Sequence, residues 1–331
     1  MSRIVILGVG AVGGTLAVKL TLAGQEVLGI ARGAQLEAIR TGGLTLLTPE
    51  GALQAEFPCV ASPAEAQLRP DDVIFLCVKT QHTEAALMQL RDAGLQDQHV
   101  FCFQNGIENE RLALRYFPNV HGVTVMLPAD FVQPGEVVCY GAPCVGSFDI
   151  GRYPSGFDAA DTVLVARLEA AGFPSATRAA VMERKYGKLL MNLGNIVGAA
   201  LGEEIDSTAV TAALKAEAEA VMAKAEIDWS DPAEEDDKRA AQLKIVEVPG
   251  VTRVGSSTAQ SLARGAGSVE TDYLNGEVAL LGRLHGVPTP CNAWFTALAA
   301  RLVRDGAAPG AVTLAEVEAA LGLSAEARAS R

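Results

Sequence analysis

Residues 3–13 read RIVILGVGAVG, a β-branched run followed at once by glycines at positions 8, 10 and 13. The run predicts a buried strand, and residues 12–23 predict a helix directly after it. Between a strand and a helix, each glycine has a physical role. Gly8 permits a tight turn, Gly10 lets a pyrophosphate approach the backbone, and Gly13 lets the helix pack on the strand. The stretch therefore predicts a dinucleotide-binding turn.

Backbone amides at the start of the predicted helix form the second part of this turn. The N-terminus of a helix offers unpaired N–H groups and the positive end of the helix dipole, and both stabilise phosphate. The alternative is a glycine-rich turn without a ligand, but the next strand, at residues 26–30, supplies the β-α-β context that a dinucleotide site requires. The residues expected to bind the cofactor here are Gly8, Gly10, Ala11, Val12 and Gly13.

The second strand leads to Arg32, close to the point where NAD-binding chains usually carry an acidic residue. An Asp or Glu there holds the ribose 2′-hydroxyl of NAD, and residues 29–32 (GIAR) contain neither. A guanidinium at the same point binds a 2′-phosphate through charge-assisted hydrogen bonds. The sequence therefore favours NADPH, the alternative being that Arg32 is an ordinary surface arginine.

Further apolar runs alternate with helical segments in the first half of the chain. Unbroken apolar strands separated by helices are typical of a parallel sheet that is covered on both faces. The predicted fold is α/β, with a Rossmann-type doubly wound parallel sheet in residues 1–178 and an all-α domain, without strand signals, in residues 179–331. The remaining strands of the sheet are expected at residues 72–78, 100–104 and 120–126.

The composition excludes several classes of protein. With 331 residues, 49% of them hydrophobic, the chain suits a two-domain globular protein better than a disordered or fibrous one. A net charge of −12 disfavours nucleic acid as a partner. We expect neither a membrane helix nor a signal peptide. The six cysteines form no Cys-x-x-Cys pair and the four histidines show no metal-ligand spacing, which indicates reduced thiols, a cytoplasmic location and no metal site.

Two polar residues follow predicted strands at their carboxyl ends. Lys79 comes directly after one buried strand, and Asn105 follows the next strand within the turn sequence Asn105-Gly106. Ligands of open α/β sheets bind outside the carboxyl ends of the strands. Both side chains are therefore expected to face the cofactor, with Asn105 beside the nicotinamide. The alternatives are a solvated lysine and a simple turn.

A polar stripe is predicted on an otherwise apolar helix in the second half. Lys188, Asn192 and Asn195 are spaced i, i+4 and i+7, which would place all three on one helical face. Residues 189–201 contain no charge, so this helix is expected to be largely buried. Buried polar groups need partners, and a substrate can be one. The alternative is a solvated stripe on a surface helix.

Seven short motifs, spread over almost the whole chain, occur in the same order as in a known family. They are Gly8-x-Gly10-Ala11-x-Gly13, Val78-Lys79, Gln104-Asn105-Gly106, Lys188-Leu189-x-x-Asn192, Ser256-Ser257, Glu270-x-Asp272-x-x-Asn275-Gly276 and Gly286-Val287-x-Thr289-Pro290-x-Asn292. Together these motifs resemble the ketopantoate reductase family.

The resemblance implies the chemistry of each domain. It implies a Rossmann domain that binds NADPH as the hydride donor, a helical domain that contributes to a homodimer, and reduction of a 2-oxo acid, with 2-dehydropantoate as the family's substrate. It makes Lys188 similar to the catalytic lysine and Glu270 to its acidic partner. The positions that match or stand near the family's substrate-binding residues are Asn105, Asn192, Asn195 and Ser257.

The sequence departs from the family's pattern near the expected substrate pocket. Asn195 follows Asn192 by three residues instead of four, and Gln260-Ser261 stands where the family has Gln-Asp. Residues 126–128 (MLP) replace the small residues that usually follow a threonine in the family. These departures leave the identity of the 2-oxo acid open.

The hypothesis for the mechanism follows from charge. Hydride delivery to a ketone carbon leaves negative charge on the oxygen, and a cationic acid lowers that barrier by donating a proton. Desolvation disfavours a buried ammonium and a nearby carboxylate stabilises it, so we expect Lys188 to be the general acid and Glu270 its partner. The alternatives are a reductase of another 2-oxo acid, a dehydrogenase that uses His82 or His285 as the acid, and a non-catalytic NADP-binding sensor.

Overall fold

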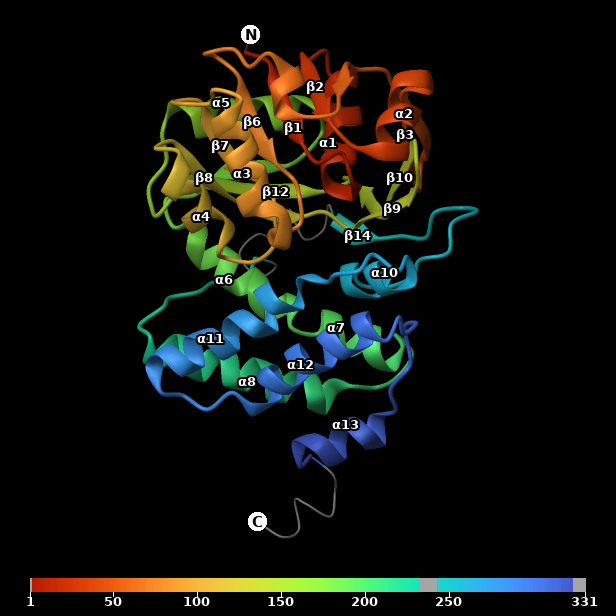
Figure 1. Cartoon of the computed structure of the whole chain (residues 1–331), viewed down its shortest axis with the longest axis vertical. Coiled ribbons are helices and arrows are strands. Elements are labelled where there is room, and N and C mark those ends of the chain that lie inside the picture. Colours follow the sequence, from red (N-terminus) through yellow and green to blue (C-terminus); the bar gives the residue numbers. More distant parts are fainter. Residues whose placement is uncertain (1, 233–242, 324–331) are drawn as a thin grey trace. The chain divides into compact units, whose positions relative to one another are not determined.

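The computed structural model describes residues 2–232 and 243–323 and contains two compact units (Figure 1). The first unit comprises Met1–Lys185 and Ser230–Thr252, and the second comprises Tyr186–Trp229 and Arg253–Arg331. The sequence predicted a single boundary after residue 178, whereas this division falls after Lys185 and returns a later segment to the first unit. In the described part of the chain, every helix is too short or too polar to span a membrane.

An eight-stranded sheet forms the centre of the first unit. Its strands, in order across the sheet, are β13 (Ser175–Thr177), β12 (Ser147–Arg152), β8 (Val120–Met126), β7 (His99–Cys102), β6 (Val73–Leu76), β1 (Ile4–Leu7), β2 (Val27–Ile30) and β5 (Cys59–Val60). The strands from β8 to β5 run parallel, which confirms the predicted α/β fold. β12 runs antiparallel to β8, so the sheet is mixed and not wholly parallel. The chain between these two strands contains no helix, whereas parallel neighbours are usually joined by a helical crossover.

Helices cover both faces of this sheet. Successive residues of β1 alternate between two cores, with Ile4 and Ile6 in one and Val5 and Leu7 in the other. The first core includes residues of α1 (Ala11–Leu22), α2 (Gly33–Gly42) and α5 (Ala159–Ala170), and the second includes residues of α3 (Thr83–Asp92) and α4 (Asn109–Tyr116). Because both faces are buried, the strands are apolar at nearly every position, which is the pattern that predicted them.

Two smaller sheets complete the first unit, and the sequence patterns did not predict them. A four-stranded sheet has the order β4 (Gly51–Ala55), β3 (Leu44–Thr48), β10 (Glu136–Cys139) and β9 (Ala129–Gln133). A two-stranded ribbon joins β11 (Gly141–Pro143) to β14 (Leu243–Ile245). β14 corrects the expectation that residues 179–331 contain no strand. It pairs with β11, about a hundred residues earlier in the chain, so its own short sequence carries little signal.

The described part of the second unit is helical, as predicted. Its elements are most of α6 (Val181–Asn192), α7 (Asn195–Leu201), α8 (Thr208–Lys224), α10 (Ser257–Ala263), η3 (Glu270–Tyr273), α11 (Asn275–His285), α12 (Pro290–Arg304) and α13 (Leu314–Leu321). The predicted polar stripe needs a correction, because α6 ends at Asn192 and a new helix begins at Asn195. The break falls at Leu193 and Gly194, and glycine has a poor helix propensity. Asn195 is therefore not on a continuous helical face with Lys188.

The six cysteines lie in the described part of the chain. All six are free thiols, and four of them are buried. Burial raises the pKa of Cys59 to about 11 and that of Cys139 to about 12. These thiols are therefore protonated and unreactive at neutral pH.

Candidate active site

The glycines of the first turn have the conformations that their roles require. Gly8 has a φ of +103°, a backbone angle that residues with a Cβ rarely adopt. A Cβ at Gly13 would lie 2.1 Å from the carbonyl oxygen of Gly8, so only glycine lets α1 pack this closely on the turn. At Gly10 a Cβ would meet no heavy atom within 4 Å. The space beside Gly10 is therefore open, and a ligand can reach its backbone.

The first turn of α1 adds hydrogen-bond donors beside this open space. α1 begins at Ala11, directly after Gly10, and no side chain in the described part of the chain caps it. The first amides of a helix lack intrahelical acceptors and carry partial positive charge. The open approach at Gly10 and the uncapped amides of Ala11 and Val12 fit the pyrophosphate of a dinucleotide.

The register of the sheet brings four chain segments to the same edge as this turn. Leu7, the last residue of β1, is paired with Ile30 of β2 and Leu76 of β6, and Leu76 is paired with Cys102 of β7. All four strands therefore end at the same level. The residues that follow them include Gly8, Arg32, Lys79 and Asn105. These predicted positions therefore follow the carboxyl ends of neighbouring strands. We call this side of the sheet the carboxyl edge.

Arg32 is the N-cap of α2, and its side chain is exposed. Its Nη2 donates a hydrogen bond to Oε1 of Gln89, at 3.1 Å. Since a guanidinium has five N–H donors and Gln89 brings no negative charge, the positive charge of Arg32 is available to an anion. This arrangement fits the 2′-phosphate of NADPH.

Lys79 and Asn105 are both half-buried. Lys79 is the N-cap of η2 (Thr80–His82), and the backbone at Asn105 is held by the buried side chain of Asn109, whose Nδ2 donates to the Asn105 carbonyl at 2.9 Å. Two loops at neighbouring strand ends thus present these side chains from an ordered backbone.

In the second unit, the side chains of Asn275, which is buried, and Ser256, which is half-buried, support the break between α6 and α7. Nδ2 of Asn275 donates to the carbonyl of Leu193 at 3.2 Å, and Oγ of Ser256 donates to the carbonyl of Asn195 at 2.8 Å. Asn192, the last residue of α6, is 6% exposed, and its Nδ2 has no hydrogen-bond partner among the described residues. A buried amide donor without a partner is unfavourable, and a bound ligand would satisfy it.

The other predicted residues of the second unit lie on three different elements. Lys188 lies on α6, Ser257 is the first residue of α10, and Glu270 is the first residue of η3; all three side chains are half-buried. Ser256 caps α10 by accepting a hydrogen bond from the amide of Ala259. In this serine pair, Ser256 therefore has a structural role, and substrate binding by Ser257 stays a prediction, as does the pairing of Lys188 with Glu270.

Sequence comparison identifies relatives of this arrangement. The profile "Ketopantoate reductase PanE/ApbA" matches residues 4–155, and the profile "Ketopantoate reductase PanE/ApbA C terminal" matches residues 180–303. The chain belongs to the ketopantoate reductase family. It is similar to the 2-dehydropantoate 2-reductase of Archaeoglobus fulgidus, with 27% identity over 88% of this chain and 95% of that protein. It is also similar to the 2-dehydropantoate 2-reductase of Mesorhizobium japonicum, with 29% identity over 91% of this chain and 97% of that protein.

Solved structures extend these similarities to the fold. The PanE/ApbA family ketopantoate reductase from Ralstonia eutropha JMP134 aligns with a TM-score of 0.75 and 28% identity, over 92% of this chain and 99% of that chain. D-mandelate dehydrogenase, solved with NADH and anilino(oxo)acetate, aligns with a TM-score of 0.75 over the same shares of the two chains, at 23% identity. The second similarity shows a common fold alone.

Each of the two ketopantoate reductase profiles contains some of the predicted site residues. The N-terminal profile contains the glycine turn, Arg32, Lys79 and Asn105. The C-terminal profile contains Lys188, Asn192, Asn195, Ser257 and Glu270. The residues expected to bind the cofactor thus lie in the match to the N-terminal profile, and those expected to act on the substrate lie mainly in the match to the C-terminal profile.

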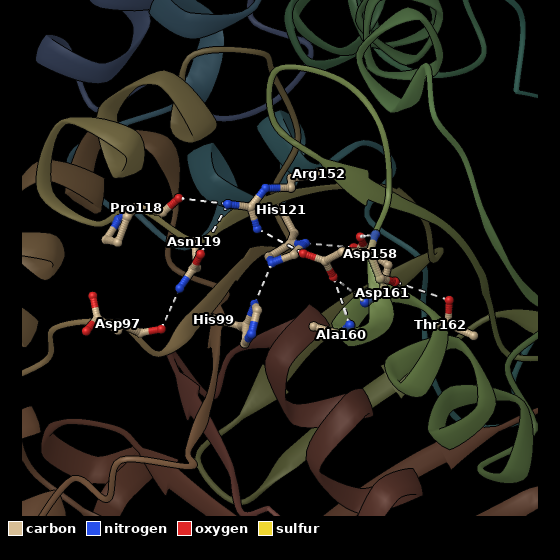
Figure 2. A network of polar contacts seen from close by, with 10 residues as sticks. All are labelled: Asp97, His99, Pro118, Asn119, His121, Arg152, Asp158, Ala160, Asp161 and Thr162. Atoms are coloured by element: carbon tan, nitrogen blue, oxygen red, sulfur yellow. Dashed lines mark hydrogen bonds and ion pairs between the residues drawn. The ribbon is translucent and has the colours of Figure 1, made fainter.

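A second polar cluster lies at the opposite, amino edge of the eight-stranded sheet, and sequence spacing missed it. Figure 2 shows His99, the first residue of β7, beside His121 of the neighbouring β8. Nδ1 of His121 lies 2.7 Å from Oδ1 of Asp161, and Nε2 of His121 lies 2.8 Å from Nδ1 of His99. A carboxylate only accepts, so His121 donates to Asp161, and a neutral His121 then accepts from His99.

The side chains of this cluster satisfy one another. Ligand atoms of His99, His121 and Asp158 lie within 4.8 Å of each other, close enough to consider a metal ion. Oδ1 of Asp158, however, accepts from the amide of Ala160 at 2.8 Å, and Oδ2 accepts from Nη1 of Arg152 at 2.9 Å (Figure 2). With the carboxylate bound to a guanidinium and the imidazoles hydrogen-bonded to each other, the cluster is arranged as a hydrogen-bond network.

A cavity of about 430 Å³ adjoins this cluster. It lies between α5 and the amino ends of β1, β6 and β7, and the residues that line it include Ser2, Val73, His99, Leu164 and Arg167. Because it opens at the amino edge, the cavity is separate from the glycine turn and is not part of the candidate active site.

Proposed function

We propose that this member of the ketopantoate reductase family uses NADPH to reduce the ketone of a 2-oxo acid, and that the acid is 2-dehydropantoate. The observation that carries the proposal is the open backbone at Gly10, next to the uncapped start of α1 and on the same sheet edge as Arg32. Relatives named 2-dehydropantoate 2-reductase, similar over most of the chain, supply the reaction class. The enzyme is thus an oxidoreductase acting on a CH–OH group.

The first unit binds and orients the cofactor in this proposal. The amides at the start of α1 hold the pyrophosphate, and Arg32 holds the 2′-phosphate through charge-assisted hydrogen bonds. Lys79 and Asn105 contact the part of the cofactor that extends along the carboxyl edge, with Asn105 nearest the nicotinamide. When bound, NADPH supplies the hydride.

The second unit supplies the groups that act on the substrate. Lys188 donates a proton to the carbonyl oxygen as negative charge develops on it, and Glu270 stabilises the ammonium form of Lys188 and contacts the substrate. Asn192, whose buried Nδ2 has no partner among the described residues, donates to the substrate, and Asn195 and Ser257 complete its contacts. General acid catalysis of this kind contributes about 10²- to 10⁴-fold to the rate.

The test follows NADPH oxidation by absorbance. Ketopantoate, which is another name for 2-dehydropantoate, is compared with bulkier and aromatic 2-oxo acids. We expect turnover with ketopantoate, and Lys188→Ala should lower kcat by about 10²-fold or more while the Kd for NADPH changes little. Lys224→Ala, which removes an exposed lysine from the same unit, serves as the control. Tight NADPH binding without oxidation by any 2-oxo acid would support the sensor alternative, and unchanged turnover in Lys188→Ala would remove Lys188 from the mechanism.

The family resemblance also motivates the proposal of a homodimer. Light scattering coupled to size-exclusion chromatography measures the mass of the particle directly. A mass of one chain at assay concentrations would contradict the homodimer and leave the reaction unaffected.

A further inference from the structure

A buried ion pair lies next to the loop that follows β7 and has no role in the proposed mechanism. Lys185 of α6 forms an ion pair with Glu110 of α4, and their side chains are 2% and 0% exposed. Nζ of Lys185 also donates to the carbonyl oxygen of Gln104 at 3.0 Å. The peptide that begins with this carbonyl leads directly to Asn105. A charged group in the interior thus holds the backbone of the residue expected beside the nicotinamide.

The pair belongs to a buried network that connects two strand ends. Nε2 of Gln104 donates to the carbonyl of Val78 and to Oγ1 of Thr83, each at 2.7 Å. Thr83 in turn donates to Oδ1 of Asn109, whose Nδ2 holds the Asn105 carbonyl. These side chains therefore cross-link two loops. The loop after β6 contains Val78 and Lys79, and the loop after β7 contains Asn105. Lys185 and Glu110 are the charged end of this network.

Stability alone does not account for a charged pair at this position. Burial raises the pKa of Glu110, and the charge of Lys185 opposes that shift. Oε2 of Glu110 has no hydrogen-bond partner among the described residues, so the carboxylate is only partly compensated. Apolar residues of similar volume often replace a buried ion pair with no loss of stability. What they cannot replace is the hydrogen bond from Lys185 to the Gln104 carbonyl.

We propose that Lys185 and Glu110 are positioning residues: Lys185 fixes the peptide between Gln104 and Asn105, and Glu110 holds Lys185 in place. The inference rests on the proposed function, because it assigns the pair to the orientation of Asn105 toward the nicotinamide and the substrate. Neither residue touches a reacting atom. Their effect is on the geometry in which Asn105 meets its ligands.

The experiment separates positioning from stability with two variants. Lys185→Met alone leaves Glu110 buried without its partner and should lower both Tm and kcat. The double variant Lys185→Met/Glu110→Met removes both charges at similar volume, and its Tm should recover toward that of the wild type. Its kcat should stay about 10²-fold low, because a displacement of about 1 Å at a reacting centre has an effect of that size. The Kd for NADPH should change little, since the phosphates bind at the glycine turn.

A second buried ion pair of the first unit provides the matched control. Arg3 and Asp72 are joined at 2.7 Å at the amino ends of β1 and β6, with side chains 10% and 0% exposed. Arg3→Met/Asp72→Leu should change Tm without a matching loss of kcat. If the Lys185→Met/Glu110→Met protein recovers both Tm and wild-type kcat, the positioning role is overturned and the pair is structural.

A readout without turnover keeps this result distinct from a failure of the proposed function. The fluorescence of the reduced nicotinamide in bound NADPH reports on its surroundings, and we expect the double variant to alter it while the Arg3/Asp72 control does not. Should wild type bind NADPH but reduce no 2-oxo acid, the proposed reaction fails while this fluorescence comparison still decides the positioning role. Absence of NADPH binding by the wild type would overturn both.

Discussion

The two edges of the eight-stranded sheet both carry polar side chains, but the surroundings of these side chains differ. At the amino edge, His99, His121 and Asp161 form a chain of hydrogen bonds in which each group has a partner. At the carboxyl edge, the space beside Gly10 is open, and the exposed guanidinium of Arg32 is hydrogen-bonded to the neutral amide of Gln89. The comparison teaches that polar residues next to apolar strands do not mark a site by themselves. In the proposed function, the open approach at Gly10 and the cationic side chain of Arg32 distinguish the carboxyl edge.

The largest expected difference between the edges concerns cofactor binding at Gly10. In Gly10→Val the side chain would fill the open space and keep phosphate away from the first amides of α1. Loss of one or two hydrogen bonds to a charged group, at about 1.5–3 kcal/mol each, raises the Kd for NADPH by about 100-fold. Isothermal titration measures this change. Gly42→Val is the control, because a Cβ at Gly42 also meets no heavy atom within 4 Å, and equal losses in both variants would contradict the assignment.

A smaller effect is expected for the choice of cofactor. Arg32→Ala should raise the Kd for NADPH by about tenfold and leave the Kd for NADH nearly unchanged, because only NADPH has the 2′-phosphate. Arg40→Ala removes an exposed arginine near the other end of α2 and should affect neither. If Arg32→Ala weakens both cofactors equally, the preference for NADPH has another source.

The smallest effect is expected at the amino edge, where substitution of His99 should leave cofactor binding and turnover unchanged. Burial, and then repulsion from His121, lowers the pKa of His99, while Asp158 and Asp161 oppose this shift and Arg152 adds to it. As the pH falls below the ordinary pKa of histidine, His99 is therefore protonated in the unfolded chain before it is protonated in the folded chain. The free energy of unfolding should thus decrease on acidification through that range, and His99→Gln should weaken the dependence.

Urea unfolding at a series of pH values between about 5 and 8 measures this dependence, since His99 has an ordinary value of about 6.5. His82→Gln, which removes an exposed histidine from the same unit, is the control. A loss of NADPH binding in His99→Gln would break the comparison, because it would couple the amino edge to the cofactor site.

Much of the first unit was predictable because its rules act over a few residues. The strand at residues 120–126 has the predicted bounds, and the helix expected at residues 12–23 lies at Ala11–Leu22. The four-stranded sheet was missed because its strands, such as β4, are largely exposed and lack a continuous apolar run. The prediction that one helix runs through Asn195 was wrong. The periodic pattern continues across the break between α6 and α7, and the side chains that support this break, Asn275 and Ser256, lie far along the chain.

The order of residues by itself predicted the strand, the glycine turn and the helix at the start of the chain, because the spacing of Gly8, Gly10 and Gly13 and the apolar runs beside it act on neighbouring atoms. Only tertiary structure decided which polar groups are satisfied. Lys185 meets Glu110 across 75 positions, and His99 meets His121 because β7 and β8 are neighbours in the sheet. Burial and hydrogen-bond partners depend on which elements pack together, and no local pattern of residues contains that information.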